Sequence, residues 1–395
     1  MCSLEPPPAS SDADIDKAKR AGVSRRGVLV RALVMVLAVG VLVAVYWPGL
    51  SGPFVFDDHG NIVRNPGVMM EELSWDYVRE AALSSYGQKG IQRPLARISY
   101  ALNYYFADQK FDRFYFKATN LIIHIINSFL LLFLMTMLLK AMRLCGDANA
   151  RVINGEPLWH WFPLVVTLVW MLHPIQLTSI LYVVQRMTSM AGTGVLVGIA
   201  LFTYGRLRVE QGRAWGMTTM VLAVGLGTTL GVVSKENAIL TPLFACLVEL
   251  FFFNRRNLDA RTWRKLKRLY VLVIGLTTVA MLTIALTRFD FIMSSYDVRN
   301  FTLLERLMTQ SRVLFKYLSL IVYPDIQEFG LFHDDIRIST SLFSPWTTII
   351  SVIGWIVVII LAVWSVRTRN LFGFGALWYL SGHIVESSVL GLEIA

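Results

Sequence analysis

Long apolar runs separated by short basic segments dominate the chain. Several of these runs reach the ~20 residues that cross a bilayer as a helix. The runs predict nine transmembrane helices, at about 27–47, 113–139, 159–173, 187–205, 215–233, 238–254, 269–287, 346–366 and 371–386. The hydrophobic pattern therefore predicts an all-α, polytopic membrane protein.

Two longer and more polar stretches interrupt the series, at about 48–112 and 288–345. Within the first stretch, 75–83 and 95–106 have the amphipathic pattern of short helices that lie on a membrane surface. The second stretch contains a similar pattern over about 302–323, which could cover the first stretch as a lid. We expect both stretches to be large loops on one side of the membrane.

Clusters of basic residues predict on which side of the membrane these loops lie. They fall between the predicted helices at 140–151, 206–213, 255–268 and 367–369. Cytoplasmic loops of membrane proteins carry such an excess of Lys and Arg. The pattern predicts a cytosolic amino terminus, a disordered cytosolic tail over 1–24 and a transmembrane domain over 25–395, with both large loops outside.

Composition agrees with this interpretation. Of the 395 residues, 55% are hydrophobic and only 16% are charged, against about 25% charged in ordinary soluble proteins. The net charge of +10 lies in the loop clusters, so it indicates membrane topology and no nucleic-acid partner. None of Cys2, Cys145 and Cys246 is placed to pair outside the cell, so no structural disulfide is expected.

An acid pair, Asp57–Asp58, follows the first predicted helix closely, where it could serve as a general base, bind a cation or only solvate a loop. Other polar residues reach the same outer side at helix ends: Arg93, His173, Gln185, Arg186, Lys235, Glu236, His383 and Glu386. Carboxylates mixed with Arg and Lys suit a phosphate-bearing ligand together with proton transfer.

Structural explanations stand beside this functional one. His173 precedes a proline and could simply end a helix, while Lys235 and Glu236 could form a neutralised pair at the interface. Arg186 could extend to lipid head groups. His383 and Glu386 share a helix face and could be a structural pair.

Two further patterns are polar. One stripe on the second predicted helix consists of Lys117, Asn120, His124 and Asn127. It suits hydrogen bonds between helices, with Asn120 and His124 as rival candidates for lining a cavity. The segment 333–335 (His-Asp-Asp) repeats the composition of the acid pair, so a divalent metal is possible there, although a solvated loop explains it as well. We assign no metal ligand.

Several short motifs occur together in one order. They are 54–58 with 61–66, Arg93-Pro94-Leu95, Asn120 with His124, Leu172-His173-Pro174-Ile175, Ser234-Lys235-Glu236, 309–313 with Tyr317-Leu318, and His383 with Glu386-Ser387-Ser388. Over about 45–390 the chain thereby resembles the C-type (GT-C) integral-membrane glycosyltransferases. It resembles most the O-mannosyltransferase-like proteins with tetratricopeptide repeats and their bacterial counterparts.

The resemblance implies a GT-C-like helical bundle in a bacterial inner membrane with a periplasmic active site. It also implies a polyprenyl-phosphate-linked sugar as co-substrate and inverting transfer to a protein Ser or Thr hydroxyl. By this resemblance, Asp57 and Asp58 are the catalytic candidates, and Arg186, Lys235 and Arg93 bind the donor phosphate. The expected supporting residues around the cavity are Asn120, His124, His173, Gln185, Glu236, His383 and Glu386.

Other functions fit the same sequence. The acceptor could be a glycolipid or an envelope polysaccharide instead of a protein. A non-catalytic transporter or scaffold for lipid-linked sugars is a further alternative. The relatives continue into more helices and repeats that this sequence lacks, so we expect it to be a truncated form.

Overall fold

The computed structural model describes residues 25–84, 93–144, 157–254, 258–287, 289–297, 299–329, 336–389 and 394. The predicted tail 1–24 and the segment 333–335 lie outside these residues. The α-helices are α2 (Arg25–Tyr46), α3 (Trp75–Leu83), α4 (Pro94–Phe106), α5 (Arg113–Leu144), α7 (Phe162–Leu172), α8 (Leu177–Leu181), α9 (Arg186–Glu210), α10 (Gly216–Val232), α11 (Thr241–Phe252), α12 (Ala260–Thr287), α13 (Phe289–Ser294), α14 (Leu303–Val322), α15 (Thr347–Thr368) and α16 (Leu371–Gly382). The described part contains no strand, so the all-α prediction is confirmed.

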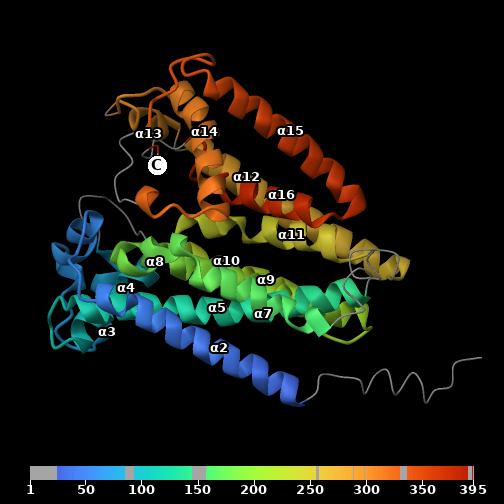
Figure 1. The fold of residues 1–395 in the computed structure, drawn as a ribbon, viewed down its shortest axis with the longest axis horizontal. Helices are drawn as coiled ribbons and strands as arrows, with labels where there is room; N and C mark the ends of the chain where they lie inside the picture. The colour runs from blue at the N-terminus through green and yellow to red at the C-terminus, as the bar shows by residue number, and fades with distance from the viewer. Residues whose placement is uncertain are drawn as a thin grey trace, which may run out of the picture.

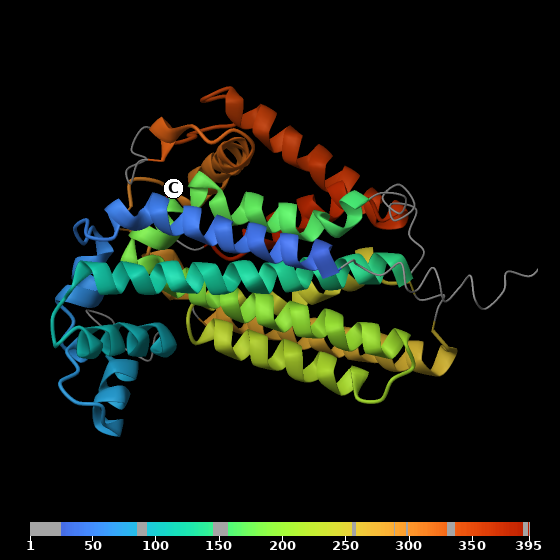
Figure 2. The same cartoon turned by 60° about the horizontal axis from the view of Figure 1, so that its bottom comes forward.

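The helices form two packed groups (Figure 1). α2, α5, α7, α9 and α10 run side by side, and α9 packs against α5, α10 and α11. The second group consists of α11, α14, α15 and α16. In it, α11 contacts α16, α16 packs on α15, and α15 packs on α14. Figure 2 shows α3 and α4 gathered beyond one end of the bundle. Thus α9 and α11 join the two groups.

Part of this bundle has the length and composition of membrane-spanning helices. In the ranges that the structure describes, four helices are long and apolar enough to cross a membrane: Arg26–Gly49, Arg113–Leu144, Val183–Glu210 and Thr347–Thr368. A bent pair, Phe162–Leu172 with Pro174–Leu181, passes the same test together with a bend of 52° and would raise the number to five. These helices are compatible with a multi-pass membrane protein. The count of nine spans stays a prediction.

The predicted amphipathic elements of the two loops are also present. α3 matches the expected 75–83, and α4 begins at Pro94, a residue well suited to the first helical position. α14 begins with a capping box, in which the Thr302 hydroxyl and the Glu305 carboxylate each accept from the other's backbone amide.

The sequence over 175–186 also predicts a surface helix, but in the structure this segment is broken. Tyr182 adopts an extended backbone (φ −95°, ψ 106°), which separates α8 from α9. The side chains of Asp58 and Asn120 hydrogen-bond the backbone on the α9 side of this break, at residues 182–184. Because these contacts satisfy the backbone without helical hydrogen bonds, the chain can turn here. Sequence periodicity could not reveal such long-range partners.

Close backbone contact joins α9 to α10. A Cβ atom added at Gly227 would lie 2.4 Å from the Gly198 Cα, and one added at Gly194 would lie 2.5 Å from the Gly231 nitrogen. Small residues at spacing of four allow such an approach in membrane helices. Glycine is therefore required at this interface.

At the other end of α9, a buried ion network joins the two groups. The Arg206 guanidinium is fully buried, and its Nε lies 2.9 Å from Glu249 of α11 while its Nη1 pairs with Glu210. A guanidinium removed from water needs such paired and hydrogen-bonded partners. Although the sequence places Arg206 in a cytosolic basic cluster, its buried partners came only from the structure.

We predict that Gly227→Ala destabilises the protein by about 1–3 kcal/mol, because its methyl group would force two helix backbones apart. Gly225→Ala in the same helix is the control, since a Cβ there meets nothing within 4 Å. Thermal unfolding in detergent measures both. Equal unfolding temperatures for the two variants would contradict this account of the interface.

Candidate functional site

The two acids of the first loop lie in different environments. The Asp58 side chain is fully buried, and its Oδ2 accepts from the Val55 amide (3.1 Å) and its Oδ1 from the Val184 amide (2.7 Å). Asp57 is exposed, and only its backbone contributes hydrogen bonds, with its amide donating to the Tyr182 hydroxyl (3.3 Å). Asp58 therefore fastens the loop to the start of α9, whereas Asp57 presents a carboxylate to the exterior.

The pKa of Asp58 follows from this burial. Loss of water around its carboxyl raises the pKa, and the amide hydrogen bonds and the positive charge of Lys117 lower it less than burial raises it. The Asp58 carboxyl accepts from two backbone amides at the base of the loop, so its role is structural. Of the pair, Asp57 is the one that a substrate could reach directly.

Arg186 is also enclosed. Its Nε donates to the Asn120 side chain (2.8 Å), its Nη1 to the Ser99 carbonyl (3.1 Å) and its Nη2 to the Phe116 carbonyl (2.7 Å). The guanidinium stacks over the Tyr100 ring at 4.8 Å. In this conformation the guanidinium is hydrogen-bonded to the protein, so it and Asn120 join α4, α5 and α9.

A polar network instead gathers where α9 and α16 meet the α10–α11 connection. The Lys235 Nζ lies 2.5 Å from Glu386 and donates to the Thr188 hydroxyl (3.0 Å). The same hydroxyl donates to the Gln185 side chain (2.8 Å). The structure thus brings together Gln185, Lys235 and Glu386 from segments far apart in the sequence, and sequence analysis missed Thr188 as their link.

The pKa of Glu386 reflects its partner. Burial alone would raise this pKa, but the charge of Lys235 and hydrogen bonds from Lys235 and Asn237 bring it below the ordinary value. Glu386 is therefore ionised at neutral pH. It occupies the position in which an anionic ligand of Lys235 would lie.

Arg93 and Glu236 form a neighbouring pair. The Arg93 guanidinium donates to both Glu236 carboxylate oxygens, with Nη2 at 3.1 Å from Oε2, and its Nη1 contacts the Met187 sulfur. The adjacent Leu95 amide donates to the Val233 carbonyl (3.1 Å). The first loop is thereby fixed to the end of α10.

His383 lies beside this network, between the rings of Tyr379 (4.6 Å) and Tyr317 (6.0 Å), and its Nδ1 pairs with the Ser387 hydroxyl. Arg306, which lies within the predicted amphipathic segment 302–323, is buried in the structure and donates to the Glu386 carbonyl (2.9 Å). α14 therefore holds the segment that follows α16.

The other two histidines among the predicted site residues, His124 and His173, lie apart from this network. The His124 Nε2 lies 2.9 Å from the Met171 carbonyl, and its ring stacks on Trp170. The His173 Nδ1 accepts from the Ile175 amide, so its Nε2 carries the proton and donates to the Ile321 carbonyl (3.0 Å). His173 thus ends α7, as one reading of the sequence proposed, and it also contacts the end of α14.

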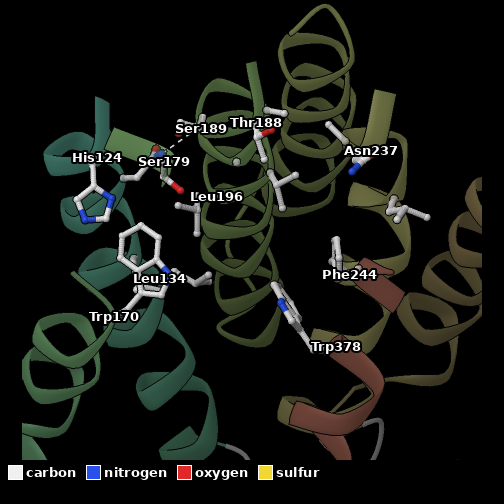
Figure 3. Close-up of a pocket in the computed structure, with 18 of the residues that line it drawn as sticks. His124, Leu134, Trp170, Ser179, Thr188, Ser189, Leu196, Asn237, Phe244 and Trp378 are labelled. Atoms are coloured by element: carbon white, nitrogen blue, oxygen red, sulfur yellow. Dashed lines mark hydrogen bonds between the residues drawn. The ribbon is translucent and has the colours of Figure 1, made fainter. Parts of the chain in front are cut away.

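A cavity of about 590 Å³ lies between these elements (Figure 3). Its apolar walls come from α5, α9, α11 and α16 and include Leu131, Leu134, Met135, Leu138, Val195, Leu196, Phe244, Phe374 and Trp378. Its polar residues are His124, Asn127, Gln176, Ser179, Thr188, Ser189, Lys235 and Asn237. In Figure 3 the labelled Ser179, Ser189, Thr188 and Asn237 lie toward one end and Trp378 toward the other.

Some of the predicted site residues line the cavity and others do not. Lys235 and His124 line it directly, and Gln185 and Glu386 lie one contact away through Thr188 and Lys235. Neither Asp57 nor Asp58 lines it. Of the Lys and Arg side chains in the described ranges, Lys235 alone contributes to its wall.

The cavity has a cation, Lys235, and the hydroxyl groups of Ser179, Thr188 and Ser189 at its polar end, and its other walls are mainly apolar. Over the ranges that the structure describes, no three His, Cys, Asp or Glu side chains converge as a metal site would require. The comparisons add no family: no protein-family model, no curated protein and no solved structure matches the chain.

We predict that Asp58→Asn destabilises the protein by about 1–3 kcal/mol, because an amide NH₂ would replace one acceptor of a buried amide hydrogen. Asp57→Asn is the matched control, since its carboxylate is exposed and makes no hydrogen bond within the described chain. Denaturant or thermal unfolding in detergent compares them. If both variants were as stable as the wild type, Asp58 would not fasten the loop.

Proposed function

We propose that this protein is an inverting glycosyltransferase that moves a sugar from a polyprenyl-phosphate donor to a protein Ser or Thr hydroxyl. The reaction would take place on the outer, periplasmic side of the membrane. One observation carries the proposal: an apolar cavity between long apolar helices has Lys235 and Thr188 at its polar end. A ligand with a long apolar tail and an anionic head matches both parts.

The surroundings of Lys235, Arg93 and Arg186 support different roles for these three cationic side chains. Lys235 is the candidate for direct phosphate contact, with Arg93 beside it on the same outer end. Both already pair with carboxylates, Glu386 and Glu236, which a phosphate would displace. Arg186 is proposed to act by holding α4, α5 and α9 in place, because its guanidinium is hydrogen-bonded to the protein.

The proposed chemistry needs one base and charge stabilisation. The acceptor oxygen attacks the anomeric carbon, its proton passes to the Asp57 carboxylate, and the bond from that carbon to the phosphate oxygen breaks. The leaving polyprenyl phosphate takes the bonding electron pair, and Lys235 stabilises its added negative charge. Attack opposite the leaving group inverts the anomeric centre.

The acceptor is the least constrained part of the proposal. A glycolipid or an envelope polysaccharide would present the same attacking hydroxyl. A second function, a non-catalytic carrier or scaffold for lipid-linked sugars, is favoured by one observation, namely that neither acid of the first loop lines the cavity. Asp58 binds the Val184 amide, and Thr188, four residues further along the chain, lines the cavity.

We predict that Lys235→Met lowers affinity for a polyprenyl phosphate at least about tenfold, the order expected for one charge-assisted hydrogen bond. Glu386→Gln should raise this affinity, because the phosphate no longer competes with a carboxylate. Binding to protein in lipid nanodiscs measures both.

Lys316→Met is the matched control, because Lys316 pairs with Glu328 at 2.7 Å and does not line the cavity. Its affinity for the lipid should equal that of the wild type. If Lys235→Met bound the lipid as well as the control does, the phosphate assignment would be wrong.

We predict that Asp57→Asn lowers the sugar-transfer rate about 10²- to 10⁴-fold, the usual contribution of a general base, while donor binding is retained. Transfer of radiolabelled sugar from the polyprenyl-phosphate donor to membrane proteins gives the rate. Asp76→Asn, an exposed acid in the same loop, should transfer normally. Unchanged transfer by Asp57→Asn would remove Asp57 as the base.

A further inference from the structure

Three polar side chains of the cavity wall have no hydrogen-bond partner in the described parts of the chain. They are Gln176 and Ser179, which lie at the bend between α7 and α9, and Ser189 in the first turn of α9. Figure 3 shows Ser179 and Ser189 on one side of Thr188, with Asn237 on the other. The cavity therefore has a second polar region besides the one at Lys235.

Neighbouring polar side chains of the cavity wall do have hydrogen-bond partners in the protein. The Asn127 side chain donates to the Ser189 carbonyl (2.9 Å) and accepts from Thr193, and His124 bonds the Met171 carbonyl. Gln176 is only 9% exposed, and its amide, which can make several hydrogen bonds, makes none with the parts of the chain that the structure describes. Because Gln176 lines the cavity, a ligand or water inside the cavity can complete these hydrogen bonds.

The chemistry of the three groups selects the ligand. One amide and two hydroxyls can each donate and accept, and they carry no charge. No Lys or Arg side chain of the described cavity wall accompanies them, because Lys235 is the one cation there and it pairs with Thr188 and Glu386. An uncharged group with several hydroxyls matches this region better than a second phosphate does.

We infer that Gln176, Ser179 and Ser189 form a hydroxyl-binding subsite that holds the sugar of a lipid-phosphate sugar. The inference rests on the proposed function for the identity of the lipid phosphate. The phosphate lies at Lys235 and Thr188, the isoprenoid chain lies among the apolar walls, and the sugar lies on the α8 side. These three residues then determine whether the protein distinguishes a glycosylated from a bare lipid phosphate.

The position of the subsite agrees with the proposed chemistry. Ser179 precedes Tyr182 by three residues, and the Tyr182 hydroxyl accepts from the Asp57 amide. The sugar would thus lie at the part of the cavity wall that is nearest in sequence to Tyr182, which the acid-bearing loop contacts. Trp170, which stacks on His124 at 4.8 Å, adds an aromatic surface to the same wall.

The test compares two ligands on each variant. A polyprenyl phosphate is titrated bare and as its mannosyl and glucosyl phosphodiesters into protein in nanodiscs. For Gln176→Leu, Ser179→Ala and Ser189→Ala, affinity for the better glycosylated ligand should fall about fivefold each, the size of one neutral hydrogen bond. Affinity for the bare lipid should stay unchanged.

Two controls fix the interpretation. Thr188→Val should lower affinity for bare and glycosylated lipids by the same factor, because it acts on the phosphate end. Thr228→Val removes a hydroxyl that bonds only its own helix, at the Val224 carbonyl (2.7 Å), and should change neither affinity. Only variants with the unfolding temperature of the wild type are compared, and the two serine variants change the least volume.

An unchanged ratio of the two affinities in all three variants would overturn the inference and assign the groups to bound water. A wild type that binds bare and glycosylated lipids equally would overturn it as well. Failure of the proposed function differs from both: a wild type that prefers the glycosylated lipid but transfers no sugar would keep the subsite and remove the enzyme.

Discussion

The buried guanidinium of Arg186 is the interaction on which the site end of this structure, around the start of α9, depends. A charge without water must be completely hydrogen-bonded, and here the acceptors come from Ser99 of α4 and from Asn120 and Phe116 of α5. Together with the Asp58 carboxylate, which holds the Val184 amide, it fixes where α9 begins. Removing either partner would leave a buried polar group uncompensated.

The position of α9 then determines the rest of the site. Gln185 directly precedes its first turn, which carries Thr188 and Ser189, so the same helix start presents the polar network on one side and the cavity wall on another. Glycine contacts with α10 bring the Lys235 segment close to that turn. α14 completes the arrangement by holding Glu386 through Arg306. Polar contacts thus join distant segments at this end of the bundle, while apolar side chains line the cavity behind them.

Local signals in the sequence were enough for the helical class and for several elements. α3, α4 and α14 lie where amphipathic periodicity and capping residues indicate, because these signals are local. The break at Tyr182 was not predictable, since its hydrogen-bond partners are more than 60 residues away. For the same reason the sequence did not distinguish buried Asp58 from exposed Asp57, or reveal that Thr188, Gln176 and Ser179 share a cavity with Lys235. From the sequence, a polar residue can be assigned to one end of a predicted helix, but its hydrogen-bond partners cannot be identified.

The central claim is that the cavity binds the isoprenoid chain of a lipid phosphate. Photo-crosslinking tests it most directly, with a polyprenyl phosphate that carries a diazirine on its chain and protein in native-like bilayers. The account predicts adducts on the cavity walls of α5 and α9, near Leu131, Leu138 and Val195, that excess unlabelled lipid suppresses. Adducts confined to exposed faces such as that of Ile353 and Ile360 in α15, and insensitive to competitor, would contradict it.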